Sequence, residues 1–437
     1  MILRKITFVL NEVKHLPTWC VYRQLSVKGK GASQFGDTIK VFHRNYPTDM
    51  FTNVTPSILS KLGENLHKKQ CNPLNLIRQR IEDFFYKHYV TRVGNPIFSI
   101  YDNMSPVVSL EQNFDSLLVP KDHVSRSLSD SYYINMEYML RAHTSAHQSD
   151  LIKSGLDAFL VIGDVYRRDA IDSTHYPVFH QAEGVRLFNQ FQLFSEVRDP
   201  TDLKLFENGV KTDDKQAELT FDATKLLEFS LKKTLQDLTV FLFGQDLEMK
   251  WVEAYFPFTH PSWELEIKYQ GQWMEMLGCG IMEQRILKDA GAGDKVGWAF
   301  GLGLERLAMK LYSIPDIRLF WSNDIGFTSQ FDVDNAATPI TYKPVSNFPH
   351  CINDISFWVP EGFQSNDFYD LVRTVGGDLI EQVNHTDDFI HPKTNRRSHC
   401  YRIMYRHMEK TLTQAEVNDL HNKISEMAKS DLGVEIR

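Results

Sequence analysis

The chain has 437 residues, of which 42% are hydrophobic and 24% charged, and its formal net charge is −8. This apolar content excludes a wholly disordered or collagen-like chain. At about 150 residues per domain, the length predicts two to three domains. No apolar run approaches the roughly 18 residues that span a bilayer, which excludes a membrane protein. The five cysteines form no close pair, so we expect no zinc site, no disulfide scaffold and a reducing compartment.

The first 30 residues predict a targeting segment. Up to Gly36 the sequence holds six basic residues and one acidic residue, Glu12, and apolar positions such as Ile2 and Ile6 recur at helical spacing. A basic, acid-poor, amphipathic start is typical of a mitochondrial transit peptide. We therefore expect residues 1–30 to be a transit peptide and the protein to work in the mitochondrial matrix. A disordered basic tail is the alternative.

Two long segments have the apolar periodicity of helices. Residues 72–90 place their apolar side chains on one helical stripe, which begins behind Asn72 and Pro73. Residues 221–243 repeat this pattern and end at Gly244, a residue that commonly follows the last turn of a helix. Both segments are therefore predicted to be helices that pack against a core.

Three other segments alternate as strands do. Residues 156–188 predict a long β-hairpin, and residues 251–280 predict further strands with a tip at Gln270-Gly271. Residues 297–312 pass from a short strand into a helix, whereas residues 200–216 predict a surface loop. Because the regular βαβ alternation of a Rossmann fold is missing, we expect a mainly antiparallel sheet flanked by helices.

The carboxy-terminal residues form a separate unit. A polar linker over residues 331–344 separates a first region, residues 31–330, from residues 345–437. The last region predicts a strand, a helix, two strands, a helix opened by a Thr413–Glu416 capping box, and a final edge strand. This βαββαβ order is the ferredoxin-like split motif. The predicted fold class is therefore α+β, with two differently built domains.

The predicted hairpin carries polar side chains on one face. Because side chains alternate along a strand, Phe179, Gln181 and Glu183 share a face of the second arm, and Arg167 ends the first arm. An arginine can bind two oxygens of a phosphate or carboxylate, and an aromatic ring can stack on a base. Gln and Glu can hold an ammonium group or a sugar hydroxyl. An ordinary solvated strand face is the alternative.

A second candidate element is the strand-to-helix segment GWAFGLGLERLAMK, residues 297–310. Gly301 and Gly303 let the backbone approach a ligand closely. Arg306 falls in the first turn of the following helix, where a terminal phosphate is favoured. A lone G-x-G is a weak signal, and a tight turn without a ligand is the alternative.

Together these segments resemble a known family. GDVYRRDAIDSTHYPVFHQAEG (163–184) and GWAFGLGLERLAM (297–309) look like motifs two and three of class II aminoacyl-tRNA synthetases. More narrowly, the chain resembles phenylalanyl-tRNA synthetases, and the carboxy-terminal unit resembles their anticodon-binding module. The fusion of that module to a catalytic chain is the architecture of the single-chain mitochondrial form, which implies a monomer. The blocks that carry the narrower resemblance are RAHTSAHQ (141–148), FHQAEG (179–184), YFPFTHPS (255–262) and LGCG (277–280).

The resemblance implies a phenylalanine–tRNA ligase. Such an enzyme activates L-phenylalanine with ATP to phenylalanyl-adenylate and transfers it to the 3′-terminal ribose of mitochondrial tRNA(Phe). ATP as substrate and Mg²⁺ as cofactor follow from it, with Arg167 and Arg306 catalytic and Glu275 a candidate magnesium ligand. The ATP-binding residues that it implies are Arg167, Thr174, His175, Phe179, Glu275 and Arg306.

The same resemblance implies an amino-acid pocket. Its polar residues would orient the α-ammonium group, its two neighbouring phenylalanines would contact the substrate ring, and Ala299 and Phe300 would line the end of the pocket. The amino-acid-binding residues that it implies are His143, Ser145, Gln148, Gln181, Glu183, Phe256, Phe258, Ala299 and Phe300.

Basic residues gather near the end of the chain. Strand alternation places Arg402 and Arg406 on one face and Tyr401 and Tyr405 on the other, so a basic face could meet RNA. A solvated positive strand is the alternative. We expect removal of residues 345–437 to spare activation but abolish transfer to tRNA. The tRNA-binding residues that the resemblance implies are Lys393, Arg396, Arg397, Arg402 and Arg406.

Two other functions stay open. The first is a class II ligase for another amino acid, against which Phe256, Phe258 and Ala299 argue because they form no site for a charged substrate. The second is a catalytically inactive, synthetase-like RNA-binding protein. Such a protein need not keep Arg167 and Arg306.

Overall fold

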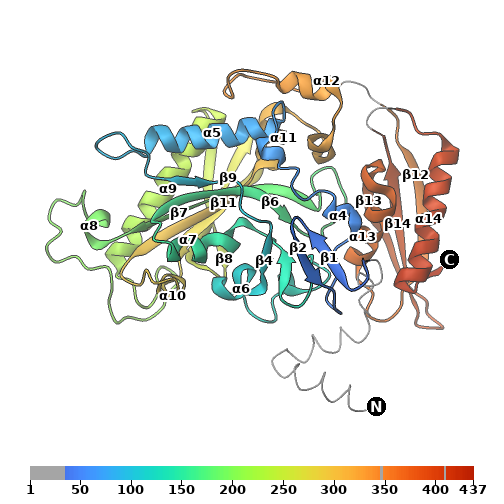
Figure 1. Ribbon diagram of the computed structural model, residues 1–437, viewed down its shortest axis with the longest axis horizontal. Coiled ribbons are helices and arrows are strands. Elements are labelled where there is room, and N and C mark those ends of the chain that lie inside the picture. The colour runs from blue at the N-terminus through green and yellow to red at the C-terminus, as the bar shows by residue number, and fades with distance from the viewer. Residues whose placement is uncertain (1–34, 345–347, 408–409) are drawn as a thin grey trace, which may run out of the picture.

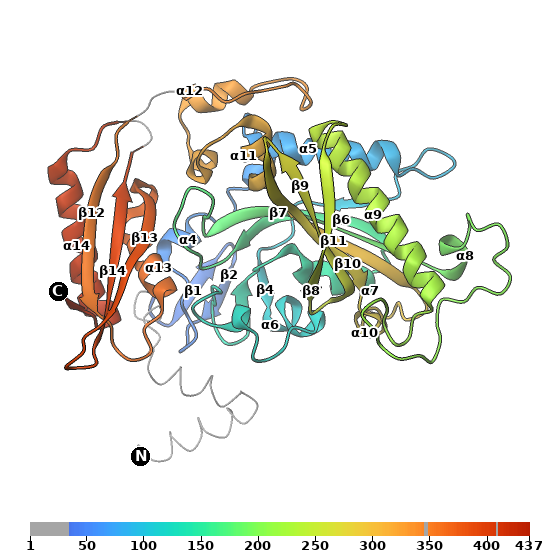
Figure 2. The same cartoon turned by 180° about the vertical axis from the view of Figure 1, so that it is seen from behind.

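Two large sheets organise the part of the chain that the computed structural model describes, which is residues 35–344, 348–407 and 410–437. The segment predicted to be a transit peptide lies outside these residues. The larger sheet has seven strands and the smaller sheet has four, and Figures 1 and 2 show them as separate bodies of the molecule. The predicted α+β fold class is confirmed.

The seven-stranded sheet contains the predicted hairpin and the strands that follow it. Neighbouring strands are antiparallel, except that the edge strand β3 runs parallel to β6. The tip between β9 and β10 is Gln270-Gly271 as predicted, and both residues have positive φ. In spatial order the strands are β3 (Ser99–Tyr101), β6 (Ala158–Tyr166), β7 (Val178–Phe188), β11 (Val296–Gly303), β10 (Gln272–Met282), β9 (Thr259–Tyr269) and β8 (Glu248–Phe256).

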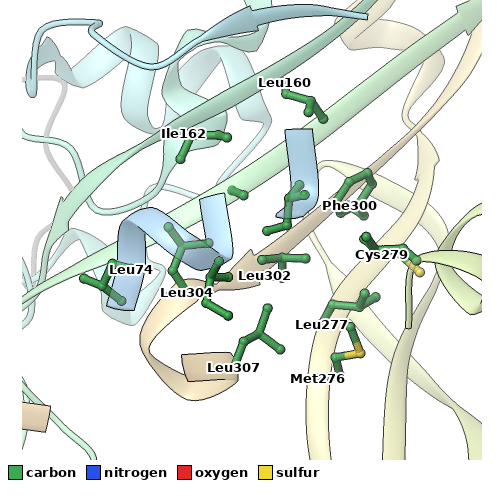
Figure 3. Close-up of a cluster of buried hydrophobic side chains, with 14 of the residues drawn as sticks. Leu74, Leu160, Ile162, Met276, Leu277, Cys279, Phe300, Leu302, Leu304 and Leu307 are labelled. Atoms are coloured by element: carbon green, nitrogen blue, oxygen red, sulfur yellow. The ribbon is translucent and has the colours of Figure 1, made fainter. Parts of the chain in front are cut away.

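Three helices bury one face of this sheet. They are α5 (Pro73–His88), α9 (Phe221–Phe243) and α11 (Leu304–Tyr312), and all three were predicted from the periodicity. The Asn72 side chain accepts a hydrogen bond from the Leu74 amide and so caps α5. Apolar side chains from these helices and from β6, β10 and β11 form the main core, part of which is drawn in Figure 3.

The opposite face of the sheet is only partly covered. Helices α7 (Gln148–Lys153) and α10 (Gln284–Asp289) pack there on a smaller apolar cluster that contains Val161, Val185 and Ala299. The remaining elements are short and were not predicted. They are β1 (Thr38–Val41), β2 (Arg44–Pro47), α4 (Pro56–Leu59), β4 (Val107–Ser109), α6 (Leu110–Asn113), β5 (Tyr138–Leu140), α8 (Gln190–Leu193) and α12 (Ile325–Thr328).

The carboxy-terminal sheet has the predicted βαββαβ order. Tyr401, Ile403 and Tyr405 are fully buried, whereas Arg402 on the opposite face is exposed. The capping box of Thr413 and Glu416 is present. The strands lie in the order β13-β14-β12-β15, and the elements are β12 (Cys351–Trp358), α13 (Ser365–Gly376), β13 (Ile380–Ile390), β14 (Arg397–Tyr405), α14 (Gln414–Leu432) and β15 (Glu435–Ile436).

No helix within the described ranges combines the length and the hydropathy needed to cross a bilayer.

Strand alternation corrects the expectation for Phe300. Neighbouring residues of a strand point to opposite faces, so Ala299 faces the smaller cluster while Phe300 faces the main core (Figure 3). The Phe300 ring stacks on Phe85 at 5.9 Å between ring centres and fills the space above Gly184. Phe300 therefore does not line the pocket with Ala299, because a residue and its neighbour on one strand cannot share a face.

The close approach of Phe300 to Gly184 predicts a stability effect. A Cβ at position 184 would lie 2.2 Å from Phe300 Cε1, whereas a Cβ at Gly301 would meet no atom within 4 Å. We expect Gly184→Ala to destabilise the chain by about 1–3 kcal/mol through overpacking, and Gly301→Ala to leave stability within about 0.5 kcal/mol. Urea unfolding of both variants measures the difference. Equal unfolding midpoints for the two variants would contradict this account.

Candidate active site

The register of three central strands builds the floor of the site. Glu183 of β7 lies opposite Val161 of β6 and Gly301 of β11, and Gln181 lies opposite Gly163 and Gly303. Paired residues of neighbouring strands point to the same side of a sheet, so the two polar side chains share the partly covered face. Space above Gly301 and Gly303 is open. The glycines therefore leave room for a ligand beside Glu183 and Gln181.

Glu183 is a buried carboxylate surrounded by neutral donors. It is 3% exposed and accepts hydrogen bonds from Ser145 Oγ, from Gln148 Nε2 and, at 3.3 Å, from Thr144 Oγ1. Burial raises the pKa of Glu183 to about 7, against the effect of these donors. Within the described part of the chain no cation pairs with Glu183. A bound ammonium group would supply the missing positive charge.

A buried arginine holds the segment that supplies these donors. The Arg141 guanidinium lies against Gly163, where a Cβ would be 2.2 Å from its Nη2. It donates to the Asp164 carboxylate at 2.6 Å and lies 2.9 Å from His147 Nε2. The turn that carries Thr144 and Ser145 is thereby fixed beside the sheet. The sequence analysis assigned no role to Arg141, although it begins the RAHTSAHQ block.

Arg167 and Phe179 lie together at the end of the hairpin, as predicted. Arg167 Nε donates to the Ala142 carbonyl at 2.7 Å, and its guanidinium carbon is 5.2 Å from the centre of the Phe179 ring. Burial lowers the pKa of Arg167, while the charges of Asp169 and Glu275 act in the opposite direction. A guanidinium group is suited to bind oxygens of a carboxylate or phosphate.

The loop that joins the two arms carries a histidine beside a carboxylate. His175 Nδ1 is 2.7 Å from the Asp172 carboxylate, and Thr174 Oγ1 donates to the same group at 2.7 Å. The hydrogen bond with Asp172 raises the pKa of His175, and the charge of Asp169 adds to this effect. His175 therefore keeps more positive charge near neutral pH than an isolated histidine. Phosphate oxygens are the ligands that such a loop favours.

Arg306 and Glu275 are paired across β10 and α11. Arg306 Nη1 donates to the Glu275 backbone carbonyl and lies near its carboxylate, both at 3.0 Å, and both side chains are about half exposed. The pKa of the neighbouring Glu264 is raised by burial and by the charge of Glu275. Two carboxylates close together can bind a divalent cation such as Mg²⁺, which takes its other ligands from water and from substrate phosphates. Across the described residues, no group of three or more potential ligands could hold a metal ion by itself.

Two phenylalanines and an alanine border an apolar region beside Glu183. The Phe256 and Phe258 rings are stacked at 5.9 Å, and Phe256 fills the space above Gly278. Phe258 packs on the cluster that contains Ala299. Its ring centre lies 6.3 Å from His143, whose pKa burial and the charge of Arg167 lower to about 3. His143 is therefore neutral. Val161 of the same cluster lies opposite Glu183, so an apolar cluster and a buried carboxylate share this face of the sheet.

Glu305, whose role was not predicted from the sequence, connects the first turn of α11 to strand β7. One carboxylate oxygen accepts from the His180 amide at 2.8 Å and the other is 2.7 Å from His180 Nδ1, with both residues buried. His180 lies between Phe179 and Gln181 on β7. Glu305 therefore fixes the first turn of α11, and with it Arg306, against the strand that carries the other site residues. Its position beside Arg306 at a helix start was the signal available in the sequence.

The predicted basic cluster of the carboxy-terminal sheet is largely paired with acids. Lys393 lies in the turn between β13 and β14. Each of the four arginines has a carboxylate partner, and so they do not form an unpaired basic patch. The pairs are Arg396 with Glu435, Arg397 with Asp388, Arg402 with Asp354, and Arg406 with Glu381.

An aromatic surface lies on the open face of the same sheet. Trp358 and Phe389 both pair with Ser398, whose small side chain separates them. The Arg437 guanidinium lies 5.2 Å from the Trp358 ring and 5.5 Å from the Phe389 ring, and Arg396 lies 4.9 Å from Trp358. Aromatic rings with arginines over them on an open sheet face favour unpaired nucleotide bases. Trp358, Phe389 and Arg437 were not predicted from the sequence, because they lie on three different strands or at their ends and come together only in the folded sheet.

The comparisons with known proteins agree with this geometry. Residues 58–196 and 215–331 match the family of tRNA synthetases class II core domain (F). Residues 346–437 match the ferredoxin-fold anticodon binding domain. The chain belongs to the class II aminoacyl-tRNA synthetases.

The curated relatives define the particular family within this class. A mouse protein named "Phenylalanine--tRNA ligase, mitochondrial" is 56% identical over 92% of this chain and 89% of its own length. A Drosophila melanogaster protein named "Probable phenylalanine--tRNA ligase, mitochondrial" is 53% identical over 91% of this chain and 92% of its own length. A Saccharomyces cerevisiae relative of the same mitochondrial name is 38% identical over 93% and 98%. Within its class, the chain is a phenylalanine–tRNA ligase.

The raised pKa of Glu183 predicts a pH dependence of phenylalanine binding. Below about pH 7 the Glu183 side chain is mostly protonated, and it must lose this proton before its carboxylate can bind the ammonium group. We expect the dissociation constant of phenylalanine, measured without ATP, to be about tenfold higher at about pH 6 than at about pH 8. The stability of the ligand-free chain depends on pH in the opposite direction. Between about pH 4.5 and about pH 7 the folded chain keeps a proton on Glu183 that the unfolded chain has lost, so the contribution of Glu183 to the free energy of unfolding falls as the pH rises through this range.

Isothermal titration calorimetry at the two pH values measures this effect. Glu183→Gln is the matched control, because it keeps the size of the side chain but has no proton to lose, so its weaker binding is expected to be independent of pH. An equal affinity of the unsubstituted chain at both pH values would refute the role of Glu183 ionisation.

Proposed function

We propose that the chain activates L-phenylalanine with ATP and transfers it to the 3′-terminal ribose of mitochondrial tRNA(Phe) in the mitochondrial matrix, acting as a monomer. The observation that carries this proposal is the position of Glu183, a buried carboxylate without a cationic partner in the described part of the chain. It lies opposite Val161, which belongs to the apolar cluster on which Phe258 packs. An amino acid with an aromatic side chain matches both the carboxylate and the apolar cluster. The mitochondrial names of the relatives and the basic, acid-poor first 30 residues support the location.

The pocket residues bind the two ends of phenylalanine. Glu183 and Gln181 hold the ammonium group, and Ser145 and Gln148 keep the Glu183 carboxylate in place. Phe256 and Phe258 contact the substrate ring, each edge-to-face contact contributing about 0.5–1.5 kcal/mol beyond the buried area. Ala299 leaves the end of the pocket deep enough for a phenyl group. Phe300, which faces the main core, takes no part.

The cationic residues bind ATP and align the reacting groups. Arg167 contacts the amino-acid carboxylate and the α-phosphate, and Phe179 stacks on adenine. Thr174 and His175 bind phosphate oxygens, and Arg306 exchanges Glu275 for the γ-phosphate. The amino-acid carboxylate attacks the α-phosphorus and pyrophosphate leaves, so the chain needs no nucleophile of its own. Positioning and charge neutralisation supply the rate enhancement. Mg²⁺, held by ATP with Glu275 and Glu264, would neutralise phosphate charge.

The carboxy-terminal domain binds tRNA through its open sheet face. Trp358 and Phe389 stack on unpaired bases, and Arg437 lies beside both rings for phosphates. Lys393 adds charge from the turn between β13 and β14. Arg396, Arg397, Arg402 and Arg406 contribute less, because all four are paired with acids. Recognition therefore depends on stacking together with charge.

Amino-acid-dependent ATP–pyrophosphate exchange tests the activation step. We expect strong exchange with phenylalanine and weaker exchange with tyrosine, since an apolar pocket rejects an added hydroxyl by only about a hundredfold. Arg167→Ala is expected to lower exchange by about 100- to 1000-fold, as loss of a group that stabilises developing charge does. Its circular dichroism is expected to be unchanged. Strong exchange with another amino acid, or near-normal exchange by a folded Arg167→Ala chain, would overturn the assignment.

Substitutions on the open sheet face test the tRNA site. We expect Trp358→Ala and Phe389→Ala each to weaken tRNA binding by about 5- to 150-fold, which corresponds to one stacked base, and to leave ATP–pyrophosphate exchange unchanged. Arg402→Ala is the matched control on the same face, and its effect is expected to be smaller because Arg402 is paired with Asp354. Filter binding at a fixed salt concentration measures the affinities. A larger loss from Arg402→Ala than from either aromatic substitution would favour recognition by charge alone.

A further inference from the structure

The loop between β6 and β7 is held from outside the catalytic domain. Arg373 of α13 donates from Nη2 to the carbonyl oxygens of Asp169 at 2.9 Å and of Ala170 at 3.1 Å. The Val383 amide donates to the Ile171 carbonyl at 3.0 Å. Three consecutive carbonyls of the loop are thus bound by the carboxy-terminal domain, whose helix α13 lies on the side toward the larger sheet (Figures 1 and 2).

Side chains strengthen this contact in the middle and near the end of the loop. Ile171 is 6% exposed and belongs to the apolar core of the carboxy-terminal domain. Tyr176 Oη donates to the Asp378 carboxylate at 2.7 Å. The position of the loop therefore depends on the carboxy-terminal domain, because the middle and the end of the loop both pack on that domain.

The same loop carries the phosphate-binding residues of the proposed function. Arg167 is its first residue, and Thr174 and His175 lie within it. The charge of Asp169, whose carbonyl Arg373 binds, acts on both Arg167 and His175. A shift of the loop backbone would therefore move these groups relative to ATP and to one another.

The hydrogen bonds that the Arg373 side chain donates both go to the loop. It is 8% exposed, and its Nη1 is buried without a hydrogen-bond partner in the described structure. Arg168, by comparison, divides its hydrogen bonds between Leu128 of the catalytic domain and the acids Asp367 and Asp370 of α13. The hydrogen bonds of Arg373 serve the loop carbonyls, whereas those of Arg168 join the two domains on both sides.

We propose that Arg373 is a positioning residue for amino-acid activation: it holds the β6–β7 loop in the form that binds ATP, so the carboxy-terminal domain acts before tRNA is bound. The proposal rests on the proposed role of the loop in ATP binding. It departs from the sequence-based expectation that removing residues 345–437 spares activation, because that removal would free the loop carbonyls and expose Ile171.

The test is ATP–pyrophosphate exchange by the full chain without tRNA. We expect Arg373→Ala to raise the KM for ATP about tenfold or more, because small misplacements of binding groups have effects of this size. The KM for phenylalanine is expected to rise much less, because Arg167, which contacts the amino-acid carboxylate, stays bound to the Ala142 carbonyl outside the loop. Arg373→Lys is expected to restore most of the affinity, since an ammonium group can donate to both carbonyls. Lys423→Ala, which removes an exposed cation from α14 of the same domain, is the control and is expected to change neither constant.

Three results would overturn the proposal, and a fourth would contradict the proposed function on which it rests. A KM for ATP within about twofold of the unsubstituted chain in folded Arg373→Ala, or an equal rise in both KM values, would overturn it. Should Arg373→Ala not fold, Ile171→Ala replaces it, because this substitution alters the loop and leaves every residue of the carboxy-terminal domain in place; an unchanged KM for ATP would again overturn the proposal. Absence of phenylalanine-dependent exchange in the unsubstituted chain would contradict the proposed function itself.

Discussion

The burial of the Glu183 carboxylate is the constraint on which the rest of the site depends. A charged group in a protein interior is costly unless donors and an opposite charge surround it. Ser145, Gln148 and Thr144 supply the donors, and these residues are held in place by Arg141 through Asp164 and His147. The opposite charge is left for the ligand. A ligand with an ammonium group offsets the free-energy cost of burying the Glu183 carboxylate, whereas a neutral ligand leaves the carboxylate without an opposite charge. The site therefore selects ligands that carry an ammonium group.

The sheet serves two purposes because its faces are built differently. One face is filled by large apolar side chains such as Phe300, and the other keeps Gly301 and Gly303 open beside polar groups. Glu305 joins the two parts of the ligand face, since its two oxygens bind the backbone and ring of His180 while its neighbour Arg306 points outward to Glu275. Rigid strands and a short helix turn therefore set the distances that the chemistry needs, as expected of a preorganised site.

Much of the fold follows from periodicity, and the failures have physical reasons. Long helices and the hairpin were predictable because burial of one face imposes a regular pattern over many residues. The very short strands carry too few residues for a pattern. The error at Phe300 came from the family resemblance taken without strand alternation. The arginines on and beside β14 looked like a free basic patch because partners such as Asp354 of Arg402 and Glu435 of Arg396 are distant in sequence. Sequence spacing contains no information on such pairs.

The carboxy-terminal domain presents two separate sets of residues. Arg373 and Val383 contact the β6–β7 loop, whereas Trp358, Phe389 and Arg437 occupy the open sheet face. No residue belongs to both sets. If the first set acts on ATP and the second on tRNA, substitutions separate the two effects: those on α13 alter activation, and those on the open face alter tRNA binding alone. The domain then contributes to activation and to transfer through different side chains. Its role in activation accounts for the position of Ile171, which places the β6–β7 loop in the core of the domain and not only against its surface.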